Sequence, residues 1–329
     1  MNAIEIKNLT KKFNELTAVD NISLEIKEGE IFGLLGPNGA GKTTILSMLS
    51  TILTPTEGSA IVNEYDIVKQ KDSVRKSIGI VFQDPSLDIE LTGRENMDFH
   101  GRLYGMNNST RKEKINNVLK LIELEDSADK IVKVYSGGMK RRLEIGRGLI
   151  HEPKILFLDE PTIGLDPQTR RKLWEYIKNL NKEQKITIIL TTHYMDEADF
   201  LCDRIAIIDH GKIIALNTAD KLKEILGGDV ITLETSEAVR LKEILEKTDY
   251  VKEVKIFDSK LNITVENGGT SIPKIIQLAQ ENNINVNSVV LKRPSLEDVF
   301  IHFTGRSIRV EEGDAKDMLK AWIRAGWRR

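Results

Sequence analysis

The feature that most constrains the fold of this chain is a glycine-rich loop between an apolar stretch, residues 31–35, and a helical pattern that begins at Lys42. The loop has the spacing G-x-x-x-x-G-K-[ST], in which backbone N–H groups surround phosphate oxygens at the start of a helix. Lys42 adds a charge at the β and γ phosphates, and Thr43 offers a hydroxyl to Mg²⁺. The predicted phosphate-binding residues are Gly36, Pro37, Asn38, Gly39, Ala40, Gly41, Lys42, Thr43 and Thr44.

A pair of acids, Asp159 and Glu160, directly follows the apolar residues 155–158. Open α/β sheets bind ligands at the carboxyl ends of their strands, so both carboxylates are predicted to reach the phosphate loop. Asp159 suits the Mg²⁺ shell, and Glu160 is the candidate base that takes a proton from the attacking water, with Lys42 assisting. Taken alone, the pair could equally be two solvated loop acids. The phosphate loop upstream favours the catalytic interpretation.

Apolar patterning predicts an α/β core with a helical insertion. Residues 155–158 and 186–190 are nearly continuous apolar runs, which is typical of strands buried on both faces of a parallel sheet. Alternation at residues 4–6 and 22–26 predicts short strands. Residues 111–122 carry apolar side chains at the three-and-four spacing of an amphipathic helix, so we expect the insertion there.

The pattern changes after Gly211, and Gly227-Gly228 is a candidate hinge. The remainder predicts the order strand, helix, strand, strand, helix, strand, and we expect a ferredoxin-like topology. The expected strands are residues 230–234, 251–257, 261–265 and 286–291, and the expected helices are residues 237–248 and 272–282. The predicted domains are a nucleotide-binding domain at 1–225, a small α+β domain at 226–305 and a charged, Trp-containing tail at 306–329.

Composition limits the compartment and the binding partners that we expect for the chain. Lys and Arg number 48 against 50 Asp and Glu, and the net charge of −2 gives no global attraction for nucleic acid or anionic lipid. No apolar run approaches the roughly twenty residues of a membrane-spanning helix. The N-terminus lacks the basic start of a signal peptide. We expect a cytoplasmic chain without a nucleic-acid partner, in which the lone Cys202 is structural.

Between the two phosphate motifs, residues 135–139 read Tyr-Ser-Gly-Gly-Met before a predicted helix that begins near Met139. Ser136 and the N–H groups of Gly137 and Gly138 can form a second anion site at the start of this helix. The Ser-Gly-Gly core resembles the signature of the ABC ATPase family, although Tyr135 and Met139 replace its usual Leu and Gln.

This resemblance implies a P-loop NTPase fold with a RecA-like core, an antiparallel β subdomain and a helical signature subdomain. It also implies that a second ATP-binding subunit, in a homodimer, pairs head to tail with the first. The signature of one subunit then closes over the ATP that the phosphate loop of the other subunit holds.

Other positions match the family's motifs in order. The resemblance implies that Phe13 stacks on adenine, that Gln83 is the Q-loop residue near the nucleotide and Mg²⁺, and that Asp166 lies in the D-loop. It implies that His193 is the switch histidine, which acts in catalysis. Two of these positions keep structural alternatives, because an aromatic residue after a strand is usually core and a lone histidine is more often packed than catalytic.

A narrower resemblance extends to the end of the chain. Residues 83–97, 103–105, 293–300 and 304–305 resemble the daunorubicin-resistance type of ATPase subunit. The resemblance implies an ATPase on the cytoplasmic face of the cell membrane that energises the export of drug-like or hydrophobic compounds. The membrane-spanning partner would be a separately encoded permease, and the transported substrate is not determined by the ATPase sequence.

The alternative function is a soluble ABC-type ATPase clamp that acts on ribosomes or nucleic acid. The single phosphate loop and the lack of a heptad run or a basic tract oppose it. A regulatory module without turnover would be expected to lack Glu160 or His193, and both are present. Residues 318–329 mix Trp with Arg and predict either a contact with a membrane or permease or a solvated helix.

Overall fold

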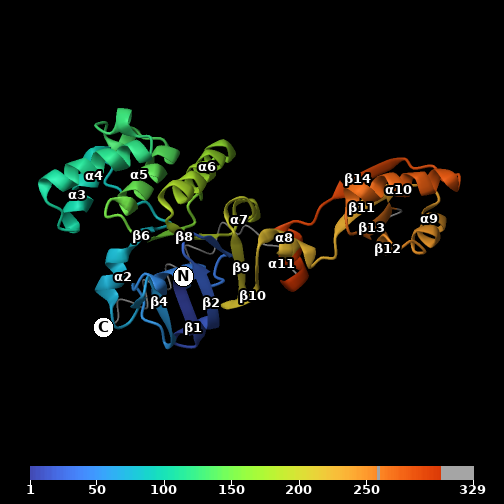
Figure 1. Ribbon diagram of the computed structural model, residues 1–329, viewed down its shortest axis with the longest axis horizontal. Helices are drawn as coiled ribbons and strands as arrows, with labels where there is room; N and C mark the ends of the chain where they lie inside the picture. Colours follow the sequence, from blue (N-terminus) through green and yellow to red (C-terminus); the bar gives the residue numbers. More distant parts are fainter. Residues whose placement is uncertain (258–259, 305–329) are drawn as a thin grey trace. The chain divides into compact units, whose positions relative to one another are not determined.

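The computed structural model describes residues 1–257 and 260–304. The chain divides after Leu216 into two compact units (Figure 1). The predicted domain bounds at residues 225 and 305 stay predictions, and the predicted tail lies outside the described residues. Among the described helices, none has both the length and the apolar character that a membrane span requires.

A six-stranded sheet forms the centre of the first unit, in the order β10-β9-β3-β8-β7-β6. Its strands are β3 (Ile31–Leu35), β6 (Ile78–Val81), β7 (Ile155–Asp159), β8 (Thr187–Thr192), β9 (Arg204–Asp209) and β10 (Lys212–Asn217). Strand β3 pairs in parallel with β8 and β9, and β7 pairs in parallel with β6 and β8. Every residue of β3, β7 and β8 is buried, which confirms the predicted strands with two covered faces.

An antiparallel sheet of the first unit has the order β2-β1-β4-β5. Its strands are β1 (Asn2–Phe13), β2 (Leu16–Lys27), β4 (Glu57–Val62) and β5 (Tyr65–Asp66). The expectation of short strands is wrong for β1 and β2, which each span 12 residues. Their pairing shifts register between Ile6 and Leu9, and Asn8 and Asn21 have φ values of 49° and 51°. These bulges interrupt the side-chain alternation, so the sequence shows only pieces of each strand.

The helical insertion lies between β6 and β7 and contains α3 (Gly93–Leu103), α4 (Asn108–Leu121) and α5 (Gly137–Leu149) (Figure 1). Helix α4 confirms the helix predicted at residues 111–122, and its Ile115 and Leu119 are buried. Thr92 and Glu95 form a reciprocal capping box that fixes the start of α3. The other elements of the first unit are α1 (Lys42–Leu49), α2 (Lys71–Ser77), η1 (Glu125–Ser127), η2 (Val132–Val134), α6 (Pro167–Gln184) and α7 (Met195–Leu201).

The second unit contains an antiparallel sheet in the order β12-β13-β11-β14. Its elements are α8 (Ala219–Glu224), β11 (Asp229–Glu234), α9 (Ala238–Leu245), β12 (Val251–Phe257), β13 (Lys260–Val265), α10 (Gly268–Glu281), β14 (Ser288–Lys292) and α11 (Leu296–Thr304). From β11 to β14 the chain order and the strand order are those of the predicted ferredoxin-like fold, which is confirmed. Buried side chains such as Ile231, Leu233 and Ile263 form a core of their own.

This core gives a stability prediction for the second unit. Ile231 on β11 is fully buried, so Ile231→Ala lowers the free energy of unfolding by about 2–5 kcal/mol. Val290 on β14 is 57% exposed, so Val290→Ala changes it by less than about 0.5 kcal/mol. Amide hydrogen exchange of β11 and β13 in the whole chain measures both effects. Equal protection in the two variants would show that the assigned faces of the sheet are wrong.

Candidate functional site

The phosphate loop connects the carboxyl end of β3 to the start of α1. Gly41 has a φ of 104°, and a Cβ there would lie 2.4 Å from the carbonyl oxygen of Ala18, so only glycine fits. The ammonium group of Lys42 donates to the carbonyl oxygens of Gly36 at 2.7 Å and Pro37 at 3.0 Å. Burial lowers the pKa of Lys42, and the nearby Glu160 carboxylate opposes this shift. The loop therefore presents one buried cation beside the backbone of a helix start.

Asp159 is the last residue of β7 and faces the start of α1. Its Oδ1 accepts hydrogen bonds from Thr43 Oγ1, at 3.1 Å, and from Thr191 Oγ1 on β8. Burial raises the pKa of Asp159, and the two threonine hydroxyls and Lys42 act against this shift. The structure thus brings Thr43 and Asp159 together, as the sequence predicts for an oxygen-ligand metal site.

Glu160 lies between two buried nitrogen groups. Its Oε1 is 3.5 Å from Lys42 Nζ, and its Oε2 is 3.0 Å from Nδ1 of His193, which directly follows β8. Burial acts to raise the pKa of Glu160, but His193 and Lys42 outweigh it and the pKa is lowered. Glu160 is therefore an ionised carboxylate at neutral pH, in the form that can accept a proton.

The signature residues open helix α5. Ser136 caps the helix and its Oγ accepts from the N–H of Met139 at 3.3 Å, so α5 begins at Gly137, two residues before the predicted start. A Cβ at Gly138 would lie 2.7 Å from Thr169 Cγ2 of α6, which explains the glycine. Tyr135, the departure from the family pattern, is buried and donates its hydroxyl to the carbonyl oxygen of Ser127 at 2.5 Å.

Besides the signature residues, three more predicted site residues lie outside the cluster around Glu160. Phe13 ends β1, is half-buried, and has Lys11 Nζ 5.0 Å from its ring centroid. Gln83 is exposed in the loop after β6. Asp166 caps α6 by accepting from the N–H groups of Gln168 and Thr169, at 3.1 and 3.0 Å. In this chain the roles of these three residues stay predictions.

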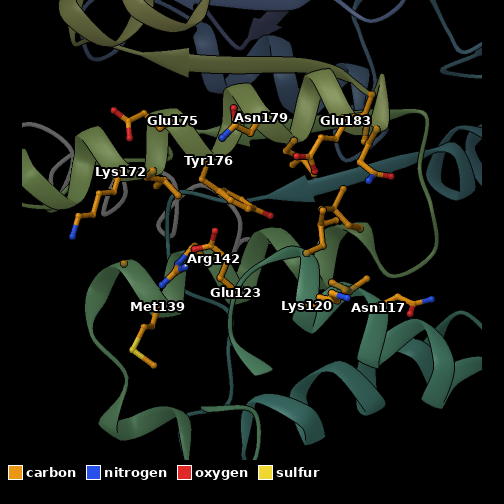
Figure 2. Close-up of a pocket in the computed structure, with 18 of the residues that line it drawn as sticks. Asn117, Lys120, Glu123, Met139, Arg142, Lys172, Glu175, Tyr176, Asn179 and Glu183 are labelled. Carbon is orange, nitrogen blue, oxygen red and sulfur yellow. Dashed lines mark hydrogen bonds and ion pairs between the residues drawn. The ribbon is translucent and has the colours of Figure 1, made fainter. Parts of the chain in front are cut away.

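A groove of about 1420 Å³ lies between α6 on one side and α4 and α5 on the other (Figure 2). Figure 2 shows Arg142 beside Glu123, and their side chains are 3.0 Å apart. Among the described residues, its lining includes Ser136 and Met139 but none of the phosphate loop. Acidic, basic and apolar side chains all line the groove. We therefore assign phosphate binding to the loop and not to the groove.

Two buried charged residues of the site, Glu197 and Arg141, are missing from the sequence prediction. Glu197, on α7, is fully buried, and its Oε1 accepts from Thr162 Oγ1 at 2.7 Å and Trp174 Nε1 at 2.8 Å. Arg141, on α5, donates to the backbone carbonyl oxygens of Asp159 and Glu160. The available signal for Glu197 was its place four residues after His193, but Asp196 and Asp199 stand beside it and spacing does not distinguish the buried acid. Arg141 stands in a run of three basic residues, where spacing does not distinguish a buried cation.

A phosphate loop after β3, two carboxylates at the end of β7 and a histidine after β8, the strand between these two, define a P-loop nucleoside triphosphatase. Comparison with known proteins narrows this class. Residues 19–163 match the ABC transporter family model, and residues 218–304 match the model of the C-terminal domain of DrrA1-3-like ATP-binding proteins.

Curated relatives match over nearly the whole chain. The daunorubicin resistance ATP-binding protein DrrA3 of Streptomyces coeruleorubidus is 39% identical, over 94% of this chain and 98% of that protein. The linearmycin resistance ATP-binding protein LnrL of Bacillus subtilis is 38% identical, over 93% and 99%. The Nod factor export ATP-binding protein I of a Rhizobium strain is 38% identical, over 93% and 98%.

Solved structures agree on the fold. A dimeric ATP-binding cassette, MJ0796, bound to ADP and phosphate after hydrolysis, matches with a TM-score of 0.58 and 32% identity, covering 65% of this chain and 98% of that one. CbiO1 of Clostridium perfringens, part of the ABC transporter complex cbiONQ, matches with a TM-score of 0.64 and 29% identity, covering 75% and 95%.

The chain belongs to the ATP-binding subunits of ABC transporters, of the daunorubicin-resistance type. It is an ATPase, and the predicted family, fold class and enzyme class are confirmed. The alternative of a soluble clamp on ribosomes or nucleic acid is not favoured, because these relatives are resistance and export ATP-binding proteins.

The Glu197 contacts give a prediction on stability. Glu197→Leu leaves the Thr162 hydroxyl and the Trp174 N–H buried without an acceptor, which lowers the free energy of unfolding by about 1–3 kcal/mol for each group. Glu197→Gln keeps an acceptor oxygen and has a much smaller effect. Urea denaturation of both variants measures the difference, and equal losses would contradict the acceptor role.

The pH dependence of the same variants tests the charge of Glu197. Burial raises its pKa above the ordinary 4.5, and the hydrogen bonds to its carboxylate only partly oppose this. The unfolded chain therefore releases this proton first, so the contribution of Glu197 to stability falls as pH rises from about 4.5 toward the folded-state pKa. Glu197→Gln lacks this titration, so its free energy of unfolding rises relative to that of the unchanged chain over that range. A pH-independent difference would contradict the raised pKa.

Proposed function

We propose that this chain hydrolyses MgATP with the residues gathered around Glu160 and energises the export of a drug-like or hydrophobic compound through a separate permease. The observation that carries the proposal is the ionised Glu160 carboxylate, held between Lys42 and His193 at the edge of the sheet where the phosphate loop lies. The names of the relatives, which refer to daunorubicin, linearmycin and Nod factor, support the export of such compounds.

The phosphate loop binds the triphosphate. Its backbone N–H groups and the start of α1 attract the phosphate oxygens. Lys42 is held at the loop by two carbonyl groups and supplies the charge for the β and γ phosphates. The residues assigned to this task are Gly36, Pro37, Asn38, Gly39, Ala40, Gly41, Lys42, Thr43 and Thr44.

Thr43 and Asp159 fit a Mg²⁺ ion. Their side-chain oxygens lie 3.1 Å apart, and the buried Asp159 carboxylate supplies the hard, anionic oxygen that this ion prefers. Gln83 is proposed to complete the site from the loop after β6. Bound Mg²⁺ neutralises phosphate charge, which lowers the barrier to attack by a nucleophile.

Glu160 then acts on water. Its carboxylate accepts a proton as the water oxygen bonds to the γ phosphorus, and the bond between the γ phosphorus and the β–γ bridging oxygen breaks, which gives ADP and phosphate. Nδ1 of His193, 3.0 Å from Glu160 Oε2, keeps the carboxylate in place and charged. We assign the catalytic roles to Lys42, Glu160 and His193.

A complete site requires a second copy of the chain. Ser136, Gly137 and Gly138 form an anion-binding helix start on α5, separate from the phosphate loop on α1. In the proposed homodimer this surface closes over the nucleotide of the partner, with Asp166 at the junction and Phe13 against the adenine. The γ phosphate makes the closed dimer more stable than the open one, and hydrolysis reverses this.

The permease is proposed to bind α3 on the cytoplasmic face of the membrane. Phe99 and Leu103 are one turn apart on this helix and are 61% and 67% exposed. Two large apolar side chains on one exposed helix face favour a protein partner over water. The loop at Gln83, which precedes α3, would carry the movement of the nucleotide site to this surface.

Substitutions in the nucleotide site test the catalytic assignment. Glu160→Gln removes the proton acceptor, so kcat for ATP falls by about 100-fold or more while MgATP binding is kept. Lys42→Ala removes the phosphate cation, so MgATP binding itself weakens. Steady-state hydrolysis and binding of labelled nucleotide measure the two effects. If Glu160→Gln hydrolyses ATP at a rate close to that of the unchanged chain, Glu160 is not the base.

The permease surface is tested in membranes. Tagged Glu160→Gln chain, solubilised with MgATP, is expected to co-purify with a polytopic membrane protein. Adding Phe99→Glu and Leu103→Glu abolishes this association, because two charges replace the apolar face. Val239→Glu, at an exposed apolar site of the second unit, is the matched control and keeps it. Ribosomes or nucleic acid in place of a membrane protein would contradict the proposed transport function.

A further inference from the structure

The guanidinium of Arg141, one turn after the signature, binds three consecutive carbonyl groups at the catalytic edge of the sheet. Its Nε donates to Pro161 O at 2.8 Å. Its Nη2 donates to Asp159 O at 3.0 Å and Glu160 O at 3.3 Å. Arg141 is only 7% exposed, so these bonds form away from water. Helix α5 therefore reaches the backbone that carries both catalytic carboxylates.

That backbone has an unusual conformation. Glu160 has a φ of 45°, in the left-handed region that residues other than glycine rarely adopt. Its N–H donates to the carbonyl oxygen and the hydroxyl of Thr191 on β8, at 3.2 and 2.9 Å. The segment is held by β8 through its N–H and by Arg141 through its carbonyl groups. The direction of the Glu160 side chain depends on both attachments.

The same guanidinium also binds the loop after β6. Nη1 of Arg141 donates to Phe82 O at 2.7 Å, and Phe82 directly precedes Gln83. Glu144, one turn further along α5, accepts from Arg141 Nη1 at 2.7 Å and from the N–H of Ser86 at 2.9 Å. One buried ion pair thus connects this loop to the backbone of the catalytic carboxylates.

Stability alone does not account for this ion pair. Burial of two charges costs desolvation energy that their attraction need not recover, so a buried pair is weak evidence for a stabilising role. Apart from Glu144, every acceptor of Arg141 in the described part of the chain is a backbone carbonyl of one of two functional segments. The planar guanidinium has five donors in a fixed fork, and a lysine ammonium at this position could not reach the same acceptors together.

We propose that Arg141 is a positioning residue for ATP hydrolysis, which holds the Glu160 backbone so that its carboxylate faces Lys42 and His193 and which ties this geometry to the loop at Phe82. The inference rests on the role proposed for Glu160. A displacement of the loop next to Gln83 changes the position of Glu160 through this one side chain. Movement at the permease-facing side is thereby converted into a change in the rate of hydrolysis.

Two variants test the proposal, with steady-state hydrolysis and MgATP binding as readouts. Arg141→Lys keeps the charge and loses the fork. The double variant Arg141→Gln with Glu144→Gln removes both charges together, since Arg141→Gln alone would leave Glu144 buried without its cation. Arg171→Gln, an exposed arginine of α6 whose partner is also exposed, is the control.

We expect kcat to fall by about 10- to 100-fold in both variants, because a small displacement of a catalytic group is enough for such a loss. KM for ATP and Kd for MgATP change by less than about threefold, since the phosphate loop is untouched. Loss of folded protein alone does not change kcat per folded chain.

An unchanged kcat in the double variant overturns the proposal. A fall in kcat with an equal weakening of MgATP binding also overturns it, because that pattern describes a structural residue. Glu160→Gln, measured in parallel, separates this inference from the proposed function. If Glu160→Gln loses turnover and the Arg141 variants keep it, only the role of Arg141 is wrong. If Glu160→Gln keeps turnover, both are wrong.

Discussion

The first unit depends on one buried electrostatic arrangement, the ionised Glu160 between Lys42 and His193. A carboxylate taken out of water is costly unless opposite charges and hydrogen bonds surround it. Its partners come from the loop after β3 and from the residue after β8, while Glu160 itself follows β7. The strand order β3-β8-β7 and the parallel pairing place these three chain segments at the same edge of the sheet. The fold therefore forms the site by bringing the carboxyl ends of these strands together at one edge of the sheet. The charge arrangement in turn requires this order of strands.

Helix α5 serves two sides of the proposed mechanism. Its first residues are the proposed anion site for the nucleotide of a second subunit, and Arg141, one turn later, reaches the backbone of Asp159 and Glu160 in its own subunit. A helix is stiff over a single turn, so a shift of the signature and a shift at Arg141 are mechanically connected. In the proposed dimer, the signature at the start of α5 is thus connected through one helix turn to the backbone of Asp159 and Glu160.

The second unit could be predicted well because its strands repeat a simple pattern. In β11 and β13 the buried residues, such as Ile231, Leu233 and Ile263, alternate with more exposed ones, as antiparallel strands with one covered face require. The same rule failed at β1 and β2, because the bulges at Asn8 and Asn21 reverse the alternation inside a continuous strand. Periodicity predicts a strand only as far as its register is regular.

The sequence by itself determined the local devices: the glycine loop with Lys42 and Thr43, the acids after a buried strand, and the Ser136 cap of α5. Each is encoded within a few adjacent residues, because backbone conformation and short-range hydrogen bonds act over that range. Only the tertiary structure decided that Glu160 lies between Lys42 and His193, and that Arg141 and Glu197 are buried against backbone and indole groups. Burial and pairing of a charge depend on segments distant in the chain, and sequence spacing contains no measure of that distance.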